Sequence, residues 1–210
     1  MAAFIVFEGI DGSGKSTQAR ALYGRLLRQD HPVLLTHEPG GTPLGESLRR
    51  WVKRRQGLYP LTELYLFNAA RAQLVEQLIR PALLEGVTVV ADRYVASTVA
   101  YQSYGRGLGL ELVEQASRGA TGGLYPDLTV FLDVPPEVGR SRKVERASDN
   151  FDSAPVEFYR KVRQGYLDQV DQARAQAQAN EKGRAWLVLD GSRSKADLSG
   201  EIWAKVQPLL

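Results

Sequence analysis

Residues 9–16 read Gly-Ile-Asp-Gly-Ser-Gly-Lys-Ser, and glycines at this spacing before a Lys-Ser pair are typical of a loop that binds phosphate groups. Glycine has no side chain, so the backbone N–H groups of such a loop can turn toward phosphate oxygens. Lys15 would reach the phosphate that is transferred, and the Ser16 hydroxyl would bind Mg²⁺. A glycine turn that fits the pattern by chance is the alternative. The flanking sequence argues against it, because an apolar run at 4–7 and a helix-prone stretch from Lys15 to about Gln29 supply the strand and helix that the loop needs.

A second group of charged side chains follows the apolar run at 87–91, where Asp92 and Arg93 are neighbours. A carboxylate at the end of a buried strand could act on Mg²⁺ directly or through water, and an arginine can bind a phosphate through two hydrogen bonds. Two alternatives stay open. Asp92 and Arg93 could pair with each other, or Asp133, which follows another apolar run, could be the acid near the metal.

Phe67 and Arg71 lie four residues apart, so they share one face of a predicted helix. An aromatic ring beside a guanidinium could hold a flat base, because the ring stacks and the guanidinium donates to a carbonyl. From the spacing alone, a buried phenylalanine with an arginine that extends to solvent is the favoured interpretation. The segment 36–42, Thr-His-Glu-Pro-Gly-Gly-Thr, predicts a tight turn that another molecule could approach closely, although many strand ends look like this.

The stretch 139–152 is basic, with Arg140, Arg142, Lys143 and Arg146 close together. One interpretation is the solvated face of a helix. The other is a mobile lid that brings arginines to a polyphosphate and excludes water during transfer. The spacing does not favour either.

The composition indicates a folded domain that handles small phosphorylated molecules. The chain has 210 residues, is 43% hydrophobic and 24% charged, and has a net charge of +3, which suits phosphorylated ligands and also allows nucleic acid. It contains no cysteine and only two histidines, His31 and His37, so disulfides are excluded and a zinc site is unfavourable. We expect no membrane span and no signal peptide, because the first predicted strand begins almost at once.

Short apolar runs alternate with helical patterns along the chain, which predicts an α/β fold with a parallel sheet in one domain spanning 1–210. Function would then lie at the carboxyl ends of the strands. We predict helices from Pro60 to Leu84, with Pro81 bending it or ending it early, from about Pro155 to Ala179 and over 195–207. The predicted strands are 4–8, 33–36, 87–91, 128–132 and 185–189.

Taken together, these segments resemble the thymidylate kinases, which phosphorylate dTMP to dTDP. The resemblance extends over nearly the whole chain, and Asp-Arg-Tyr followed by Tyr-Gln eight residues later separates this family from adenylate and guanylate kinases. It implies a three-layer fold with strand order 2-3-1-4-5, ATP as phosphoryl donor, Mg²⁺, a cytoplasmic location and a homodimer, with no nucleic acid or membrane partner. The segments that carry it are 7–17, 38–42, Phe67 with Arg71, 92–94 and 100–102.

The resemblance also implies roles for individual residues. ATP phosphates would be bound by Gly9, Asp11, Gly12, Ser13, Gly14, Lys15, Ser16 and Thr17, and Mg²⁺ by Ser16 and Asp92. The dTMP site would comprise Asp11, Glu38, Pro39, Arg49, Phe67, Arg71, Arg93, Ser97, Thr98, Tyr101 and Gln102. Asp11 would accept a hydrogen bond from the 3′-hydroxyl, Phe67 would stack on thymine, Arg71 would bind O4, and Tyr101 would press on the sugar where a ribonucleotide carries its 2′-hydroxyl.

The catalytic set implied by the resemblance is Lys15, Asp92, Arg93, Arg142 and Arg146. The phosphate loop carries no arginine, which resembles the bacterial type of member in which an arginine of the lid at 139–152 supplies the missing charge. The chain departs from the usual lid pattern because it reads Asp-Asn-Phe-Asp at 149–152, so the role falls to Arg140, Arg142 or Arg146, of which the last two are favoured. A kinase for another nucleoside monophosphate and a nucleotide-binding module without turnover are the remaining alternatives.

Overall fold

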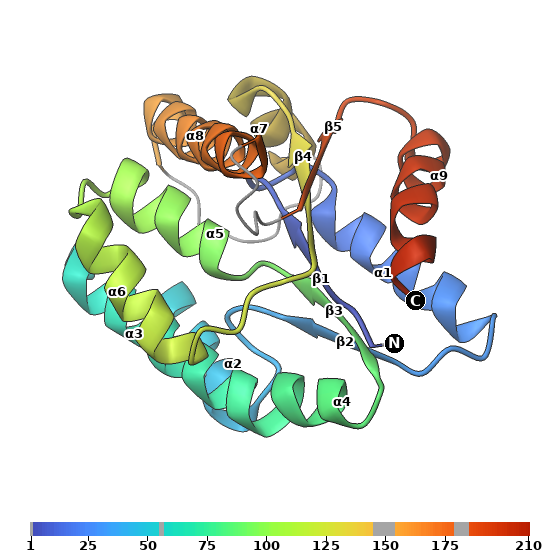
Figure 1. Ribbon diagram of the computed structural model, residues 1–210. Helices are drawn as coiled ribbons and strands as arrows, with labels where there is room; N and C mark the ends of the chain where they lie inside the picture. Colours follow the sequence, from blue (N-terminus) through green and yellow to red (C-terminus); the bar gives the residue numbers. More distant parts are fainter. Residues whose placement is uncertain (1, 55–56, 145–153, 179–184) are drawn as a thin grey trace.

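The computed structural model describes residues 2–54, 57–144, 154–178 and 185–210 (Figure 1). Within these ranges five parallel strands form one sheet in the order β2-β3-β1-β4-β5. This confirms the α/β class and the predicted strand order, and each strand begins and ends within one residue of its predicted bounds. The strands are β1 (Phe4–Glu8), β2 (Val33–His37), β3 (Thr88–Asp92), β4 (Leu128–Asp133) and β5 (Trp186–Asp190).

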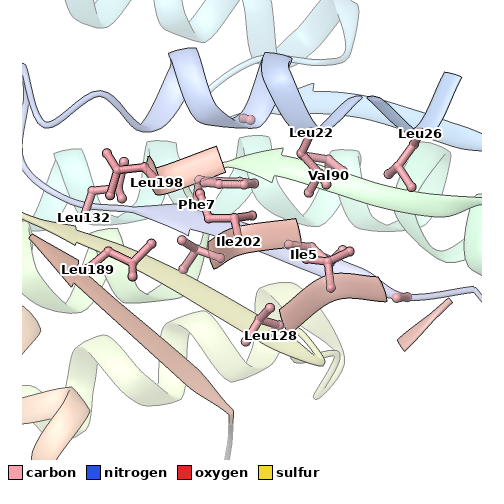
Figure 2. Close-up of a cluster of buried hydrophobic side chains, with 14 residues drawn as sticks. Ile5, Phe7, Leu22, Leu26, Val90, Leu128, Leu132, Leu189, Leu198 and Ile202 are labelled. Atoms are coloured by element: carbon pink, nitrogen blue, oxygen red, sulfur yellow. The ribbon is translucent and has the colours of Figure 1, made fainter. Parts of the chain in front are cut away.

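The central strand β1 contributes side chains to the hydrophobic core on each face of the sheet, because successive side chains of a strand point to opposite faces. Ile5 and Phe7 point to the face that α1 (Lys15–Leu27) and α9 (Lys195–Val206) cover, and they pack there against apolar residues of both helices (Figure 2). Phe4 and Val6 point to the opposite face. Burial on both faces accounts for the continuous apolar run that predicted this strand.

The opposite face is covered by the helical segment that continues from α3 (Pro60–Leu74) and by α8 (Val156–Gln178) (Figure 1). The helix α3 also packs against α2 (Pro43–Arg54) and α6 (Leu110–Thr121). The remaining helical segments are α5 (Val95–Thr98), the π-helical η2 (Val99–Gly105), α7 (Pro136–Val144) and a final short turn, η3 (Gln207–Leu209). No helix in the part of the chain that is described is both long and apolar enough to cross a membrane.

The helix that starts at Pro60 extends to Leu84, as predicted, and of the two effects expected of Pro81 the early end does not occur. The helix continues through a π-helical turn, η1 (Val75–Ile79), into α4 (Arg80–Leu84). Proline lacks an N–H group and its ring collides with the carbonyl four residues earlier in a regular α-helix. The wider π turn just before Pro81, in which Arg80 N donates to Val75 O, relieves this conflict and lets the helix continue.

Candidate active site

The glycine-rich loop lies between the carboxyl end of β1 and the start of α1, where the sequence predicts a phosphate site. Gly9 has φ +147°, and a Cβ there would lie 2.7 Å from the Leu132 carbonyl oxygen, so only glycine fits. Gly14 has φ +97° and precedes the first residue of α1, whose first N–H groups have no partner within the helix. The Ser13 hydroxyl is buried and has no hydrogen-bond partner among the described residues. The loop therefore offers backbone and side-chain donors to an anion.

Lys15 is held at this loop with only 6% of its surface exposed. Its Nζ donates to Ile10 O at 3.3 Å and lies 3.5 Å from Asp11 Oδ1. Burial lowers the pKa of Lys15, because removal from water disfavours the charged form. A phosphate group beside Nζ would supply the negative charge that favours the ammonium form.

Ser16 and Asp92 lie together at the ends of α1 and β3, and the Ser16 hydroxyl donates to Asp92 Oδ2 in a short hydrogen bond. The other oxygen of this carboxylate, Oδ1, is buried and has no partner among the described residues. A hydroxyl and a carboxylate oxygen fit Mg²⁺, which binds few protein oxygens and takes its other ligands from phosphates and water. Accordingly, the described residues contain no group of three or more His, Cys, Asp or Glu that could hold a metal ion.

Asp133, the other candidate for the acid near the metal, is engaged elsewhere. Arg163 of α8 donates to both of its oxygens, from Nε at 2.6 Å and from Nη2 at 2.7 Å. This two-bond pair occupies Asp133 at the end of β4. Asp92 is therefore the acid that could serve a metal beside the phosphate loop.

Arg93 directs its guanidinium toward the loop and pairs there with Asp11, so the alternative in which it pairs with Asp92 is not what the structure has. Its Nη2 donates to Asp11 Oδ1 at 2.5 Å and to the Tyr101 hydroxyl at 3.2 Å. Its Nη1 donates to Ser97 Oγ at 2.9 Å. Lys15 and Arg93 thus contact the same oxygen of Asp11.

The Phe67 and Arg71 pair differs from the interpretation that spacing favoured. Arg71 does not extend to solvent but is only 2% exposed, whereas Phe67 is half-buried. Arg71 Nε and Nη2 donate to the buried Glu38 carboxylate, with the shortest contact at 2.6 Å, and Nη2 also donates to Thr98 Oγ1 at 2.8 Å. Nη1 donates to Asn68 Oδ1 at 3.2 Å, so one Nη1 hydrogen is left over among the described contacts. That hydrogen is available to a ligand carbonyl.

Gln102 lies nearby on η2 with its amide orientation set by Glu63. Gln102 Nε2 donates to Glu63 Oε2 at 3.3 Å, and Arg106 donates to both oxygens of the same carboxylate at 3.0 Å. One of the two amide hydrogens is thereby used, which points the nitrogen toward Glu63 and leaves the carbonyl oxygen of the amide to accept. A donor on Arg71 and an acceptor on Gln102 match a base edge that presents a carbonyl next to an N–H group.

The turn after β2 carries the remaining residues of the expected dTMP site. Glu38 and Pro39 are joined by a cis peptide bond, and Arg49 of α2 lies over this turn, where its Nη1 donates to Pro39 O at 3.0 Å. Burial raises the pKa of Glu38, and the adjacent Arg71 guanidinium opposes this effect. The structure therefore joins Glu38 to Arg71 and Arg49 to Pro39 at this turn.

The expected lid lies only partly within the described residues. Residues 139–144 form the last part of α7, whereas 145–152, with Arg146, lie outside the described ranges. Arg140 is exposed, and Arg142 Nη1 donates to Gly191 O at 2.8 Å just beyond β5. The backbone of α7 is seated on the phosphate loop, because a Cβ on Gly12 would lie 2.0 Å from Gly139 O and a Cβ on Gly139 would lie 2.5 Å from Asp11 O.

Sequence reasoning missed four residues that shape this site: Glu8, Glu63, Tyr166 and Arg163. An acid that ends an apolar strand, as Glu8 does, was a detectable signal. Tyr166 was predicted only as part of an apolar helix face, and its hydroxyl donates to Glu8 Oε2 at 3.0 Å. Nothing in the local sequence pairs Glu63 with Arg106 or Arg163 with Asp133.

Comparisons with known proteins agree on one family. The family model described as thymidylate kinase matches residues 7–197. A thymidylate kinase of Deinococcus radiodurans is 45% identical over 205 residues, covering 97% of this chain and 95% of the relative, and one of Thermomicrobium roseum is 42% identical over 212 residues, covering 100% and 97%. A crystal structure of thymidylate kinase from Ehrlichia chaffeensis superimposes with a TM-score of 0.75 and 33% identity, covering 98% of each chain.

Proposed function

The chain belongs to the thymidylate kinase family, enzymes that phosphorylate dTMP to dTDP, and from that premise we propose which of its residues carry out the transfer from ATP. The observation that carries the proposal is the meeting of Lys15 and Arg93 at one oxygen of Asp11. Lys15 belongs to the loop for the donor phosphates, and Arg93 belongs to the turn after β3. Two cations from different segments of the chain that meet at one carboxylate oxygen suit two phosphate groups brought end to end.

When nucleotides bind, their phosphates take the place of the Asp11 carboxylate beside Lys15 and Arg93. Lys15 then stabilises the charge on the phosphoryl group in transfer, and Arg93 holds the acceptor phosphate in line. The released Asp11 carboxylate accepts a hydrogen bond from the 3′-hydroxyl of the deoxyribose. Gly9, Gly12, Ser13, Gly14 and Thr17 complete the cradle for the donor phosphates.

Mg²⁺ would be held by the Ser16 hydroxyl and by Asp92, directly or through water, where it would neutralise charge on the donor phosphates. The unpartnered Oδ1 of Asp92 supports this assignment. Arg142, or Arg146 in the lid at 139–152, supplies the further positive charge that the glycines of the loop lack. The whole chain, 1–210, acts as one kinase domain.

The thymine base is recognised at the other end of the site. Phe67 stacks on the ring, the remaining Nη1 hydrogen of Arg71 donates to O4, and the Gln102 carbonyl accepts from N3–H. Thr98 supports Arg71, to which its hydroxyl is bonded, and Tyr101 presses on the sugar. The remaining residues support the turn and the acceptor phosphate; they are Glu38, Pro39, Arg49 and Ser97.

The chain assembles as a homodimer through the surface formed by α2, α3 and α6. Large apolar side chains are exposed there: Tyr59 just before α3, Leu61 and Tyr65 on α3, Leu44 on α2 and Leu112 on α6. An apolar surface of this kind suits a two-fold interface. Light scattering after size exclusion would test it, and a monomer at micromolar concentration would contradict it. Because ATP and dTMP are intracellular metabolites, we place the enzyme in the cytoplasm.

The function is tested by measuring ADP formation with dTMP, dUMP, dCMP, AMP and GMP as acceptors. We expect dTMP to be preferred and dCMP to be rejected, because the amino group and unprotonated N3 of cytosine would face a donor on Arg71 and an acceptor on Gln102 in the wrong order. A preference for AMP or GMP would overturn the base assignment. Salt-dependent DNA binding without ADP formation would support the non-catalytic alternative instead.

A further inference from the structure

Glu8 ends the central strand β1 and is fully buried, with 0% of its surface exposed. Its carboxylate accepts four hydrogen bonds: Oε1 from Tyr94 N at 2.9 Å and Ser97 N at 3.1 Å, and Oε2 from Ser97 Oγ at 2.5 Å and the Tyr166 hydroxyl at 3.0 Å. An ionised carboxylate has about four such acceptor positions and no donor. The surroundings of Glu8 are therefore matched to a carboxylate in number and in kind.

The hydroxyl groups of Ser97 and Tyr166, which lie beside Glu8, also accept hydrogen bonds from Arg93. Arg93 Nη1 carries two hydrogens, and it lies 2.9 Å from Ser97 Oγ and 3.4 Å from the Tyr166 oxygen. Each hydroxyl has a single hydrogen. The two hydroxyl oxygens also lie 2.8 Å apart, so one hydroxyl can donate to the other instead of to Glu8. In either arrangement their hydrogens point to Glu8 or to the neighbouring hydroxyl, and both oxygens turn lone pairs toward the guanidinium.

The backbone at Arg93 depends on the same end of β1. Arg93 has φ +77°, in the left-handed region that side-chain-bearing residues rarely adopt. Its own N–H donates to Phe7 O at 2.9 Å, and the next N–H, that of Tyr94, donates to Glu8 Oε1. Residues 7 and 8 thus hold both ends of the strained peptide in place.

On the basis of the function proposed above, we propose that Glu8 is a positioning residue for the acceptor phosphate: it orients the Ser97 and Tyr166 hydroxyls so that they hold Arg93 toward the incoming monophosphate. Glu8 itself touches neither nucleotide. Tyr166 comes from α8, 158 residues away along the chain. The network therefore joins the helix that follows the lid segment to the arginine that binds dTMP.

A glutamine at position 8 has the same shape but can satisfy only one half of the network at a time. If its amide nitrogen faces the hydroxyls, neither hydroxyl can donate to it; one can donate to the other, and the remaining hydrogen is left to point toward Arg93 Nη1. If the amide is flipped, its hydrogens oppose the N–H groups of Tyr94 and Ser97. Glu8→Gln therefore separates the need for a carboxylate from the need for bulk.

The test compares binding of dTMP with binding of thymidine, which lacks the phosphate that Arg93 contacts. Calorimetry would be run on the wild type, Glu8→Gln, Ser97→Ala and Tyr166→Phe. We expect the preference for dTMP over thymidine to fall at least tenfold in Glu8→Gln and several-fold in Ser97→Ala and Tyr166→Phe, while thymidine affinity and the KM for ATP stay within twofold of wild type. Ser97→Thr keeps the hydroxyl and should retain the preference. Glu76→Gln and Tyr104→Phe are the matched controls.

Equal losses of dTMP and thymidine affinity would show that Glu8 is only structural and would overturn the proposal, as would an unchanged preference in all three variants. If Glu8→Gln does not fold, the double variant Ser97→Ala with Tyr166→Phe carries the same test, because it leaves the carboxylate and its backbone hydrogen bonds in place. A wild-type protein that binds neither dTMP nor thymidine would instead refute the proposed function, so the two failures are distinguishable.

Discussion

The helix α7 packs so closely against the phosphate loop that one methyl group added at Gly139 should displace the loop and lower the rate of phosphoryl transfer. A Cβ added by Gly139→Ala would lie 2.5 Å from Asp11 O, about 0.9 Å short of the 3.4 Å at which ordinary contact begins. The nearest atom is a backbone oxygen, and the next two belong to the Ile10 side chain. A backbone atom cannot turn aside as a side chain can, so α7 and the loop must move apart by most of that distance. Misplacement of reacting groups by about 1 Å costs on the order of 100-fold in rate, so we expect kcat to fall roughly 10- to 100-fold.

Stability should change far less than activity. Gly→Ala in a helix gains up to about 1 kcal/mol, and overpacking costs about 1–3 kcal/mol, so the net loss should be roughly 0–2 kcal/mol. Gly119→Ala in α6 is the control, because a Cβ there meets no atom within 4 Å. It should leave kcat unchanged and stabilise by about 0.5–1 kcal/mol. Coupled ADP assays and urea unfolding would measure both variants. A folded Gly139→Ala enzyme with kcat within twofold of wild type would show that the contact between α7 and the loop does not set the positions of the reacting groups.

Three further predictions concern charge and protonation. Lys15→Ala should lower kcat by about 100- to 1000-fold with folding intact, and near-normal turnover would contradict the role of Lys15 at the transferred phosphate. Arg71→Ala should destabilise the fold by about 3–5 kcal/mol in urea unfolding, because it leaves the buried Glu38 unpaired; adding Glu38→Gln should recover part of the loss, and no recovery would contradict this reason. Burial raises the pKa of Tyr101, so the folded chain keeps a proton that the unfolded chain releases near pH 10. Stability should therefore fall as pH rises above about 10, and Tyr101→Phe should flatten that slope in urea unfolding at several alkaline pH values.

The sheet could be predicted from the sequence because its strands are buried on both faces. Such strands are short apolar runs, and between them lie longer helical patterns. The positions of these runs in the sequence therefore predict the bounds of β1 to β5 to within one residue. The phosphate loop could be predicted for a similar reason. The loop requires positive φ angles at Gly9, Gly12 and Gly14, and glycine is the residue that adopts them without strain, so the requirement is visible in the sequence.

The contacts that could not be predicted join residues far apart in the chain. Spacing favoured an Arg71 that reaches solvent, and this was wrong because Glu38, 33 residues earlier, supplies a buried partner. Pro81 predicted a disturbance of this helix, but it did not predict its form, a π turn that keeps the helix continuous. Glu8 and Tyr166 meet only because β1 and α8 pack together, which no local pattern encodes.

Glu8 and Gly9 are neighbours at the carboxyl end of β1. The hydrogen-bond network that holds Arg93 starts at Glu8, and the loop that binds the donor phosphates starts at Gly9. β1 is the middle strand, paired with β3 on one side and with β4 on the other, so its carboxyl end is anchored from both sides. A single peptide unit therefore separates the network that holds Arg93 from the loop that binds the donor phosphates. One residue inserted at this junction would therefore change the spacing between the network and the loop even in a chain that still folds.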